Sequence, residues 1–241
     1  MSGTDTPGDM ALMQALDATW PPQRVWHDGP FLMRDGAGGG QRVSATFLKP
    51  GANPDEAIDL IHKMESPLFR VLEGDDDQAR LLERAGLQRH DTTLFRVGPA
   101  ADIATKPGPA KVFFGWPVLE AHRRVWAKGG IGPARIEVMQ RAPGTKTALL
   151  GRLGDAPVAT GFVAISGDIA MLHALEVLPE ARRCGVGRTL TEAAADWAVS
   201  QGARWLGLAV TKANTGANAL YEGLGLAHVG GYHYRTSKDH A

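Results

Sequence analysis

The segment EARRCGVGRTL, residues 180–190, has the residue types of an anion-binding loop. It lies between an apolar stretch and an amphipathic one, so Gly185 and Gly187 fall where a strand would turn into a helix. Glycines let the backbone approach a ligand closely, and the first N–H groups of a helix have no acceptor within it. Guanidinium groups, which suit phosphate oxygens, are supplied by Arg182, Arg183 and Arg188. The segment predicts a phosphate site, and a pyrophosphate fits it best.

Two other phosphate-binding loops fit this segment less well. A P-loop requires Lys and then Ser or Thr after its last glycine, whereas Gly187 is followed by Arg188. A dinucleotide-binding turn requires a third small residue where Leu190 lies. It also requires an acidic residue about 20 positions later, where this chain has an uncharged run. The alternative that stays open is a glycine-containing turn with solvated arginines.

A second motif begins after the next strand candidate. It reads Asn214-x-x-Ala217-x-x-Leu220-Tyr221-x-x-x-Gly225-Leu226, and it follows the loop motif Arg182-x-x-Gly185-x-Gly187. Together the two motifs resemble the GNAT superfamily of acyl-CoA-dependent N-acetyltransferases, over roughly residues 111 to 236. Both motifs at this separation are a stronger signal than either motif alone.

The resemblance implies where the CoA thioester, acetyl-CoA, would bind. In that family the arginine and glycine loop holds the CoA pyrophosphate, the strand before it pairs with the pantetheine arm, and the Asn of the later helix contacts the cofactor. The positions that this implies for cofactor binding are Leu175, Val177, Arg182, Arg183, Cys184, Gly185, Val186, Gly187, Arg188, Thr189, Asn214 and Ala217. The family's Tyr protonates the departing thiolate, and the matching residue is Tyr221.

The chemistry of acyl transfer agrees with these roles. Direct transfer from a thioester to an amine needs a neutral amine, a polarised carbonyl and a proton for the leaving sulfur. A tyrosine hydroxyl, with a pKa of about 10, stays protonated at neutral pH and can donate as the thiolate forms. Tyr221 therefore has the right type for a general acid, although a ring that covers helix–strand packing would look the same in sequence.

The general base has several candidates. Strict alternation along residues 171–177 puts His173 on one face with Leu175 and Val177, and Glu176 on the other face. A histidine, with a pKa of about 6.5, can take an ammonium proton directly or through water. The strand around His173 also resembles the matching strand of aralkylamine N-acetyltransferases, in which a histidine helps to deprotonate the amine. Glu176 and a water chain remain alternatives, and a strand histidine is commonly a packing residue.

Other reactive or aromatic residues have weaker claims. Cys184 has no acidic residue or histidine close in sequence to complete a relay, so we expect a passive small residue rather than an acyl-cysteine nucleophile. The resemblance places acceptor-binding walls at Trp116, Trp126, residues 129–133 and residues 232–234, although core packing explains the tryptophans equally well. Histidines and cysteine do not fall at metal-ligand spacing, so we predict no metal site.

Periodicity and turn signals predict the elements that position these residues. In the first half we expect a strand over 42–48, a helix from the capping residue Asn53, a strand over 68–73, a helix over 77–85 and a strand over 87–97. In the second half we expect helices over 117–127, 134–141, 187–201 and 215–223, and strands over 146–152, 158–165, 169–177, 205–210 and 226–235.

The two halves echo one another. A shift of 139 residues places the sequence LLERAGL, which begins at Leu81, on LYEGLGL, which begins at Leu220. We therefore predict a duplication, with a degenerate first copy: Leu82 stands where Tyr221 stands, and residues 48–53 have one glycine and a proline, so they could not align a row of backbone donors. The predicted domains are 1–98, the linker 99–110, rich in Pro, Gly and Ala, and the catalytic unit 111–241.

Composition narrows the function class further. Lys plus Arg equals Asp plus Glu at 26 each, so we expect neither nucleic acid nor a membrane as a partner. Cys184 is the single cysteine and cannot form an internal disulfide, and the first residues lack the features of a secretion signal. No apolar run approaches the ~20 residues that span a bilayer. We expect a cytoplasmic protein.

The prediction from sequence is an α/β (α+β) fold with a GNAT-like mixed, mostly antiparallel sheet, splayed at Val177, in tandem with a smaller degenerate GNAT-like domain. The predicted function is an acyltransferase that moves the acetyl group of acetyl-CoA to a primary amine in a ternary complex, with no metal. The acceptor is a small-molecule amine or a protein or peptide amine, and a homodimer is left open. The alternatives are a non-catalytic acyl-CoA sensor and an enzyme that uses another acyl donor.

Overall fold

The computed structural model describes residues 6–108 and 111–237. Before residue 109 the elements are α1 (Asp9–Thr19), β1 (Arg24–Asp28), β2 (Phe31–Asp35), α2 (Gln41–Ser44), β3 (Phe47–Leu48), α3 (Pro54–Ile61), β4 (Leu68–Leu72), α4 (Asp76–Arg84), β5 (Gln88–Pro99) and α5 (Ala100–Ile103). After residue 110 they are β6 (Val112–Gly115), α6 (Glu120–Lys128), α7 (Pro133–Arg141), β7 (Lys146–Leu153), β8 (Ala156–Ser166), β9 (Ile169–Val177), a 3₁₀ turn (Pro179–Ala181), α8 (Val186–Ser200), β10 (Trp205–Thr211), α9 (Thr215–Glu222) and β11 (Ala227–Thr236).

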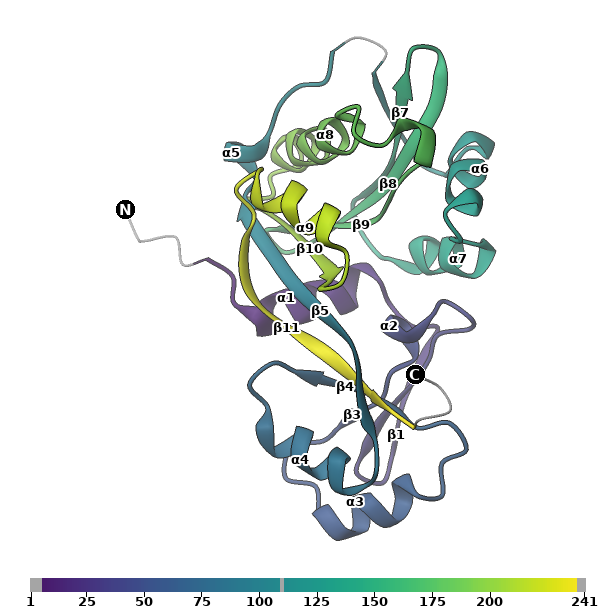
Figure 1. Ribbon diagram of the computed structural model, residues 1–241, viewed down its shortest axis with the longest axis vertical. Helices are drawn as coiled ribbons and strands as arrows, with labels where there is room; N and C mark the ends of the chain where they lie inside the picture. The colour runs from purple at the N-terminus through teal and green to yellow at the C-terminus, as the bar shows by residue number, and fades with distance from the viewer. Residues whose placement is uncertain (1–5, 109–110, 238–241) are drawn as a thin grey trace.

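The main sheet runs through both halves of the molecule. Its strand order is β4-β11-β5-β10-β9-β8-β7-β6, and a smaller sheet has the order β1-β2-β3. Only the β9–β10 pair of the main sheet is parallel among the described strands. Figure 1 shows β5 and β11 side by side along the length of the molecule, from the upper half into the lower one. The predicted fold class, a mixed and mostly antiparallel sheet flanked by helices, is confirmed.

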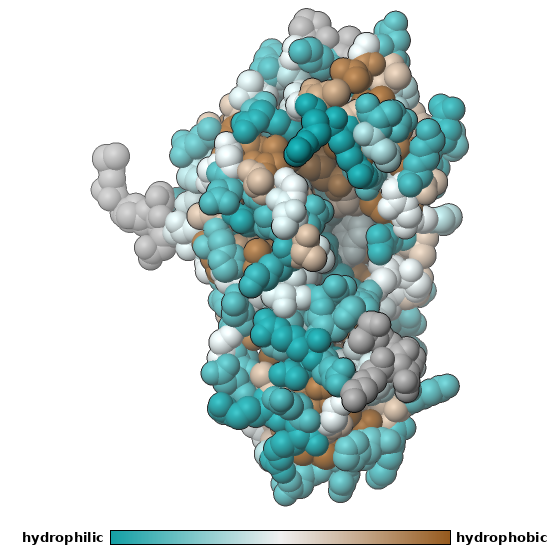
Figure 2. All heavy atoms as spheres, viewed as in Figure 1, coloured by the Kyte–Doolittle hydropathy of each residue, from teal (hydrophilic) through white to brown (hydrophobic). Residues whose placement is uncertain are grey.

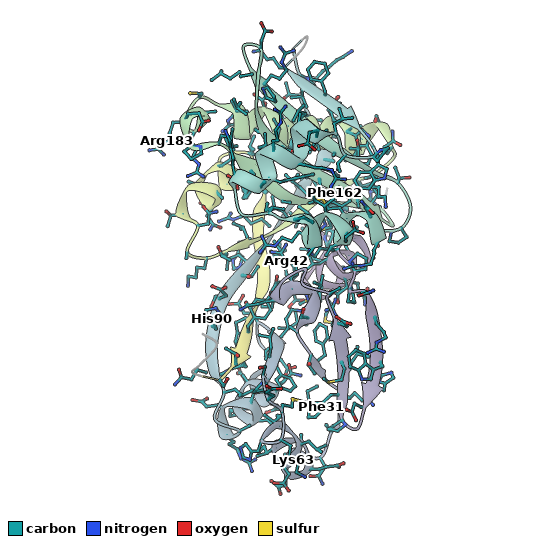
Figure 3. All side chains as sticks on the ribbon, turned by 90° about the vertical axis from the view of Figure 1, so that its right-hand side faces the viewer. Phe31, Arg42, Lys63, His90, Phe162 and Arg183 are labelled. Atoms are coloured by element: carbon teal, nitrogen blue, oxygen red, sulfur yellow. The ribbon has the colours of Figure 1, made fainter. Side chains whose placement is uncertain are left out.

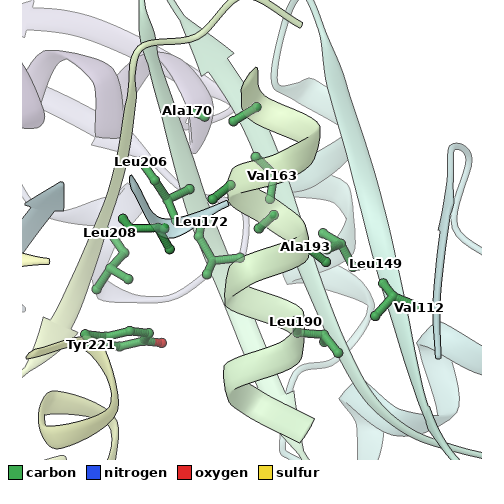
Figure 4. Close-up of a cluster of buried hydrophobic side chains, with 14 of the residues drawn as sticks. Val112, Leu149, Val163, Ala170, Leu172, Leu190, Ala193, Leu206, Leu208 and Tyr221 are labelled. Atoms are coloured by element: carbon green, nitrogen blue, oxygen red, sulfur yellow. The ribbon is translucent and has the colours of Figure 1, made fainter. Parts of the chain in front are cut away.

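Helices cover both faces of this sheet. On one face, α8 packs its small residues Ala193 and Ala194 against Leu172 and Leu206 of the parallel strands (Figure 4). On the other face, α1 buries Leu16 and its apolar neighbours against β8, β9, β10 and β11. α1 was not predicted from sequence. Its N-terminus at Asp9 has no side-chain cap, so the signal that usually marks a helix start is missing.

Most predicted elements are confirmed, with ends that differ by a few residues. The helix start at Asn53 is among them, because the Asn53 side chain accepts hydrogen bonds from the N–H groups of Asp55 and Glu56. Of the strand predicted over 42–48, only β3 at Phe47–Leu48 is a strand, and the prediction is wrong for the residues before it. Residues 41–44 form the single turn α2, and Val43 is fully buried and packs so close to Gly39 that a side chain there would overlap it.

The predicted 139-residue echo extends to the strand pairing. Shifted by 139, β4, α4 and β5 coincide with β10, α9 and β11 to within a few residues at their ends. The pair Thr211↔Thr93 of β10 and β5 maps onto Leu72↔Tyr232 of β4 and β11. The four strands are therefore related by an internal two-fold symmetry. The last strand of the first half, β5, pairs with β10 of the second half, and the last strand of the second half, β11, pairs with β4 of the first.

This exchange affects how the chain divides into units. β5 precedes the predicted linker but lies between β10 and β11, which follow it. Within 99–110, residues 100–103 form α5, and residues 109–110 lie outside the described residues. The division at 99–110 stays a prediction, and the sheet of the later unit includes a strand from the earlier one.

We predict that a chain beginning at residue 111 does not fold alone, because β10 and β11 would lose the strand between them. Circular dichroism and size-exclusion chromatography of this fragment should show an aggregated or unfolded chain. Co-expression with residues 1–110 should restore a soluble complex, since β5 is then available. A fragment that unfolds cooperatively by itself would contradict the shared-sheet account.

Candidate active site

A cavity of about 1360 Å³ opens where β9 and β10 separate. The two strands pair from Ile169↔Trp205 to Leu172↔Leu208, and then β9 continues without its parallel neighbour. The sheet therefore splays after Leu172 rather than at the predicted Val177. The surface in Figure 2 is hollowed between the elements of the upper half, with hydrophobic residues on the upper wall of the hollow.

The predicted anion loop forms one wall of this cavity. Arg183 (φ 65°) and Gly185 (φ 78°) adopt the left-handed conformation, and α8 begins at Val186. The hydrogen bond from the Thr189 N–H to the Gly185 carbonyl closes the first turn of the helix. The N–H groups of residues 186–188 come before this bond, at the N-terminus of α8. The loop has the backbone N–H groups and the helix N-terminus that bind phosphate.

The arginines of this loop differ in their contacts. Arg182 donates to the carbonyl of Val177 at 3.0 Å and lies 3.4 Å from the Glu176 carboxylate, so it fixes the loop to β9. Arg188 donates to the carbonyl of Gly223, which ties the loop to the end of α9. Arg183 lines the cavity and has no ion pair among the residues that the structure describes. Its guanidinium stands at the margin of the upper half in Figure 3.

The other predicted cofactor positions are mostly brought together. Leu175, Val177, Asn214 and Ala217 line the cavity, as do the loop residues from Arg182 to Arg188 except Cys184. Cys184 is exposed and its thiol contacts the Arg182 carbonyl, and Thr189 bonds back to Gly185. Neither lines the cavity, because Cys184 faces solvent and Thr189 lies one turn into α8. The Asn214 side-chain oxygen caps α9 by accepting from the Ala217 N–H.

Tyr221 reaches the cavity from α9. It is 6% exposed and belongs to the core cluster that α8 covers. Its hydroxyl points from α9 toward the helix that carries Leu190 (Figure 4). Burial raises the pKa of the Tyr221 hydroxyl above its usual value. The phenol therefore keeps its proton at physiological pH, as a general acid requires.

His173 is held between the two halves of the molecule. Its Nε2 lies 2.8 Å from the Thr19 hydroxyl, and its ring stacks on Trp20 with centroids 5.0 Å apart. Its Nδ1 is buried and has no hydrogen-bond partner within the described part of the chain. Burial, and then the charge of Arg42, hold the pKa of His173 well below its ordinary range. The ring is therefore neutral at pH 7.

A bulge in β9 overturns the predicted alternation of faces. Ala174 has a φ of 49°, and the register with β8 shifts at this point. Leu172 and Leu175 consequently face the same side, where both approach Gly161. The prediction that His173 shares a face with Leu175 and Val177 is wrong, because one extra residue reverses the alternation after it.

Glu176 consequently lies on the same side of the sheet as His173. Its carboxylate packs against Gly129 at the end of α6 so closely that a side chain at residue 129 would overlap it. The α6 residue Trp126 belongs to the same core cluster as Trp20, on which His173 stacks. The Glu176 side chain is 18% exposed and lines the cavity. Both predicted base candidates are therefore on the same side of β9, and both line the cavity.

Comparison with known proteins places this cavity in a family. Residues 117–226 match the family model described as acetyltransferase (GNAT) family. The chain contains a GNAT domain. No curated protein sequence matches the chain significantly.

Solved structures resemble the whole chain and not only the GNAT domain. A GCN5-related N-acetyltransferase from Kribbella flavida is 20% identical with a TM-score of 0.68, and the match covers 94% of each chain. A conserved protein of unknown function from Staphylococcus epidermidis is 12% identical with a TM-score of 0.65 and covers 91% of this chain and 95% of its own. A tandem GNAT protein from the clavulanic acid biosynthesis pathway is 15% identical with a TM-score of 0.60 and covers 94% and 87%. At these identities the likeness shows the fold alone.

The first half supplies cavity residues that were not predicted from sequence. They are Trp20, Gly39, Gly40, Gln41, Arg42, Asp91 and Thr93. No local motif marks them. They lie at the end of α1, in and just before α2, and on β5, and only the folded chain brings these segments to the cavity. Of the predicted acceptor walls, Ile131 and Tyr234 line the cavity. Trp116 and Trp126 pack in a core cluster instead, and the Trp126 indole donates to the Ala174 carbonyl at 2.8 Å.

Over residues 6–108 and 111–237, no three or more His, Cys, Asp or Glu side chains gather in a way that could hold a metal ion. None of the helices in that same part of the chain combines the length and the apolar composition needed to span a bilayer.

We predict that Arg183→Glu weakens CoA binding about tenfold or more, because it removes a charge-assisted contact beside the amides of α8. Isothermal titration calorimetry with CoA measures the change. Arg124→Glu, the same charge change at an exposed site on α6, is the matched control and should bind CoA like the unmodified chain. Equal affinities for all three proteins would contradict an anion site at this loop.

Proposed function

We propose that the chain transfers the acetyl group of acetyl-CoA directly to a primary amine within a ternary complex. The observation that carries the proposal is the continuity of one cavity, which joins the anion loop, the unpaired edge of β9 and the Tyr221 phenol to His173 and Glu176. The acceptor is an amine of a small molecule, peptide or protein, and it enters from the side that the first half of the chain encloses.

The groups around the cavity match the steps of such a transfer. The amine nitrogen attacks the thioester carbonyl carbon, the carbon–sulfur bond breaks, and the thiolate takes a proton. β9 does not pair with β10 beyond Leu172. Its backbone N–H and C=O groups on that side can therefore bind the extended pantetheine arm. The Tyr221 phenol, protonated through burial, is the proton source for sulfur.

Glu176 is better suited than His173 to accept the amine proton. Its carboxylate lies in the cavity wall, whereas the His173 Nδ1 is buried and its Nε2 contacts Thr19. In this proposal His173 shapes the acceptor side through its stack on Trp20, and Glu176 takes the proton directly or through water.

We predict that Tyr221→Phe keeps CoA affinity and lowers kcat by about 10²-fold or more, the usual size of a general-acid contribution. The ring is retained, so the packing under α8 is undisturbed. Release of free thiol from acetyl-CoA over a panel of amines gives kcat, and calorimetry gives the affinity. Unchanged turnover would remove the assigned acid, and acetyl-CoA binding without thiol release by the unmodified chain would instead favour a sensor.

We predict that Glu176→Gln lowers kcat by about 10²-fold, with a rate that keeps rising with pH as the fraction of free amine grows. His173→Gln should change the KM of the amine more than kcat, because its role is to shape the acceptor side. Steady-state kinetics between pH 6 and pH 9 on both variants separate the two roles. A large loss of kcat confined to His173→Gln would reassign the base to histidine.

A further inference from the structure

Arg42 is a cationic residue from the first half of the chain that lines the cavity. It comes from the short turn α2, and Figure 3 shows it where the two halves meet. Its Nε donates to the Tyr232 hydroxyl at 3.1 Å, and its Nη2 reaches the Ala209 carbonyl at 3.4 Å. These contacts fix the guanidinium against β10 and β11 and leave it among the residues that line the cavity.

The Arg42 charge has no carboxylate partner among the described residues, unlike two neighbouring arginines. Arg34 and Arg70 both pair with Asp17, at 3.0 and 2.6 Å. Arg42 instead contacts a phenol and a carbonyl oxygen, and no ion pair of the described chain includes it. The neighbouring phenols stabilise the charged guanidinium but supply no carboxylate, so an anion that entered the cavity could make a charge-assisted contact there.

A second cation lies on the same wall. Arg135 of α7 lines the cavity, and its guanidinium approaches the backbone of Gly40, two residues before Arg42 in the sequence. The carboxylates that line the cavity, Glu176 and Asp91, form no ion pair with Arg42 or Arg135 among the described residues. Glu176 pairs with Arg182 toward the cofactor loop, and Asp91 lies 3.3 Å from His90 on β5. Over residues 6–108 and 111–237, therefore, two cavity-lining guanidinium groups have no carboxylate partner, and Glu176 lies nearer the cofactor loop through its contact with Arg182.

We infer that the acceptor is a small amine that also carries an anionic group, bound by Arg42, with its amine directed toward Glu176. The inference rests on the proposed function and narrows its substrate class. Free amino acids fit, with a carboxylate on the guanidinium, and aminoalkyl phosphates share the same chemistry. An amine without an anionic group would leave the Arg42 charge uncompensated.

The test compares matched acceptors that differ in the anionic group. Free amino acids, the corresponding decarboxylated amines and aminoalkyl phosphates are titrated into the CoA-loaded full chain by calorimetry, and thiol release from acetyl-CoA is measured in parallel. We expect binding by amino acids or aminoalkyl phosphates and at least tenfold weaker binding by the anion-free amines. Whether amino acids or aminoalkyl phosphates bind more tightly shows whether the site prefers a carboxylate or a phosphate. Equal or tighter binding of the anion-free amines would overturn the inference.

Variants of Arg42 test the assigned contact. Arg42→Gln should lower kcat/KM for the anionic acceptor at least tenfold relative to an anion-free amine, and Arg42→Lys should lose less because it keeps the charge. Arg124→Gln on the exposed face of α6 is the matched control, and thermal melting shows whether each variant is folded. An equal loss for both kinds of acceptor would contradict the inference.

Measuring acceptor binding and thiol release separately shows whether the substrate class or the proposed catalysis has failed. Anionic amines that bind the CoA-loaded chain without any thiol release would support the substrate class and refute catalysis. Thiol release with anion-free amines alone would support catalysis and refute the substrate class.

Discussion

β9 and β10 pair as parallel strands only as far as Leu172 and Leu208, and the site depends on their separation beyond that point. The separation leaves one edge of β9 without a partner and opens the space between this edge and α9. It also places the N-terminus of α8, with the left-handed Gly185, at one end of the space. The anion loop, the Tyr221 phenol and the acceptor side are therefore arranged along a single cavity.

The two halves repeat the same elements, but they differ in whether a gap between two of their strands is open. In the second half the gap between β9 and β10 is open. In the first half the corresponding gap between β2 and β4 is filled, because β3 pairs with β2 and Thr46 bridges to Phe69 of β4. The segment that fills it is preceded by α2, which carries Arg42 to the cavity of the other half. The first half thus has no open gap of its own and supplies part of the cavity wall of the second half.

The loop and the helix ends were predictable because their signals are local. Arg182, Gly185 and Gly187 are adjacent in sequence, and Asn214 and Tyr221 lie on one short helix. The bulge at Ala174 was not predictable, since alanine gives no sign of a positive φ and strict alternation places His173 on the wrong face. Arg42 could not be assigned either, because its contact with Ala209 depends on a packing between halves that only the folded chain reveals.

The central claim is that one gap of the duplicated sheet is open and accepts a CoA thioester. Calorimetric titration of the full chain with acetyl-CoA tests it most directly, because stoichiometry reports how many gaps are open and the heat reports whether the loop binds. The account predicts one saturable site per chain. Two equivalent sites would contradict the closure of the first gap, and the absence of binding at millimolar acetyl-CoA would contradict the account as a whole.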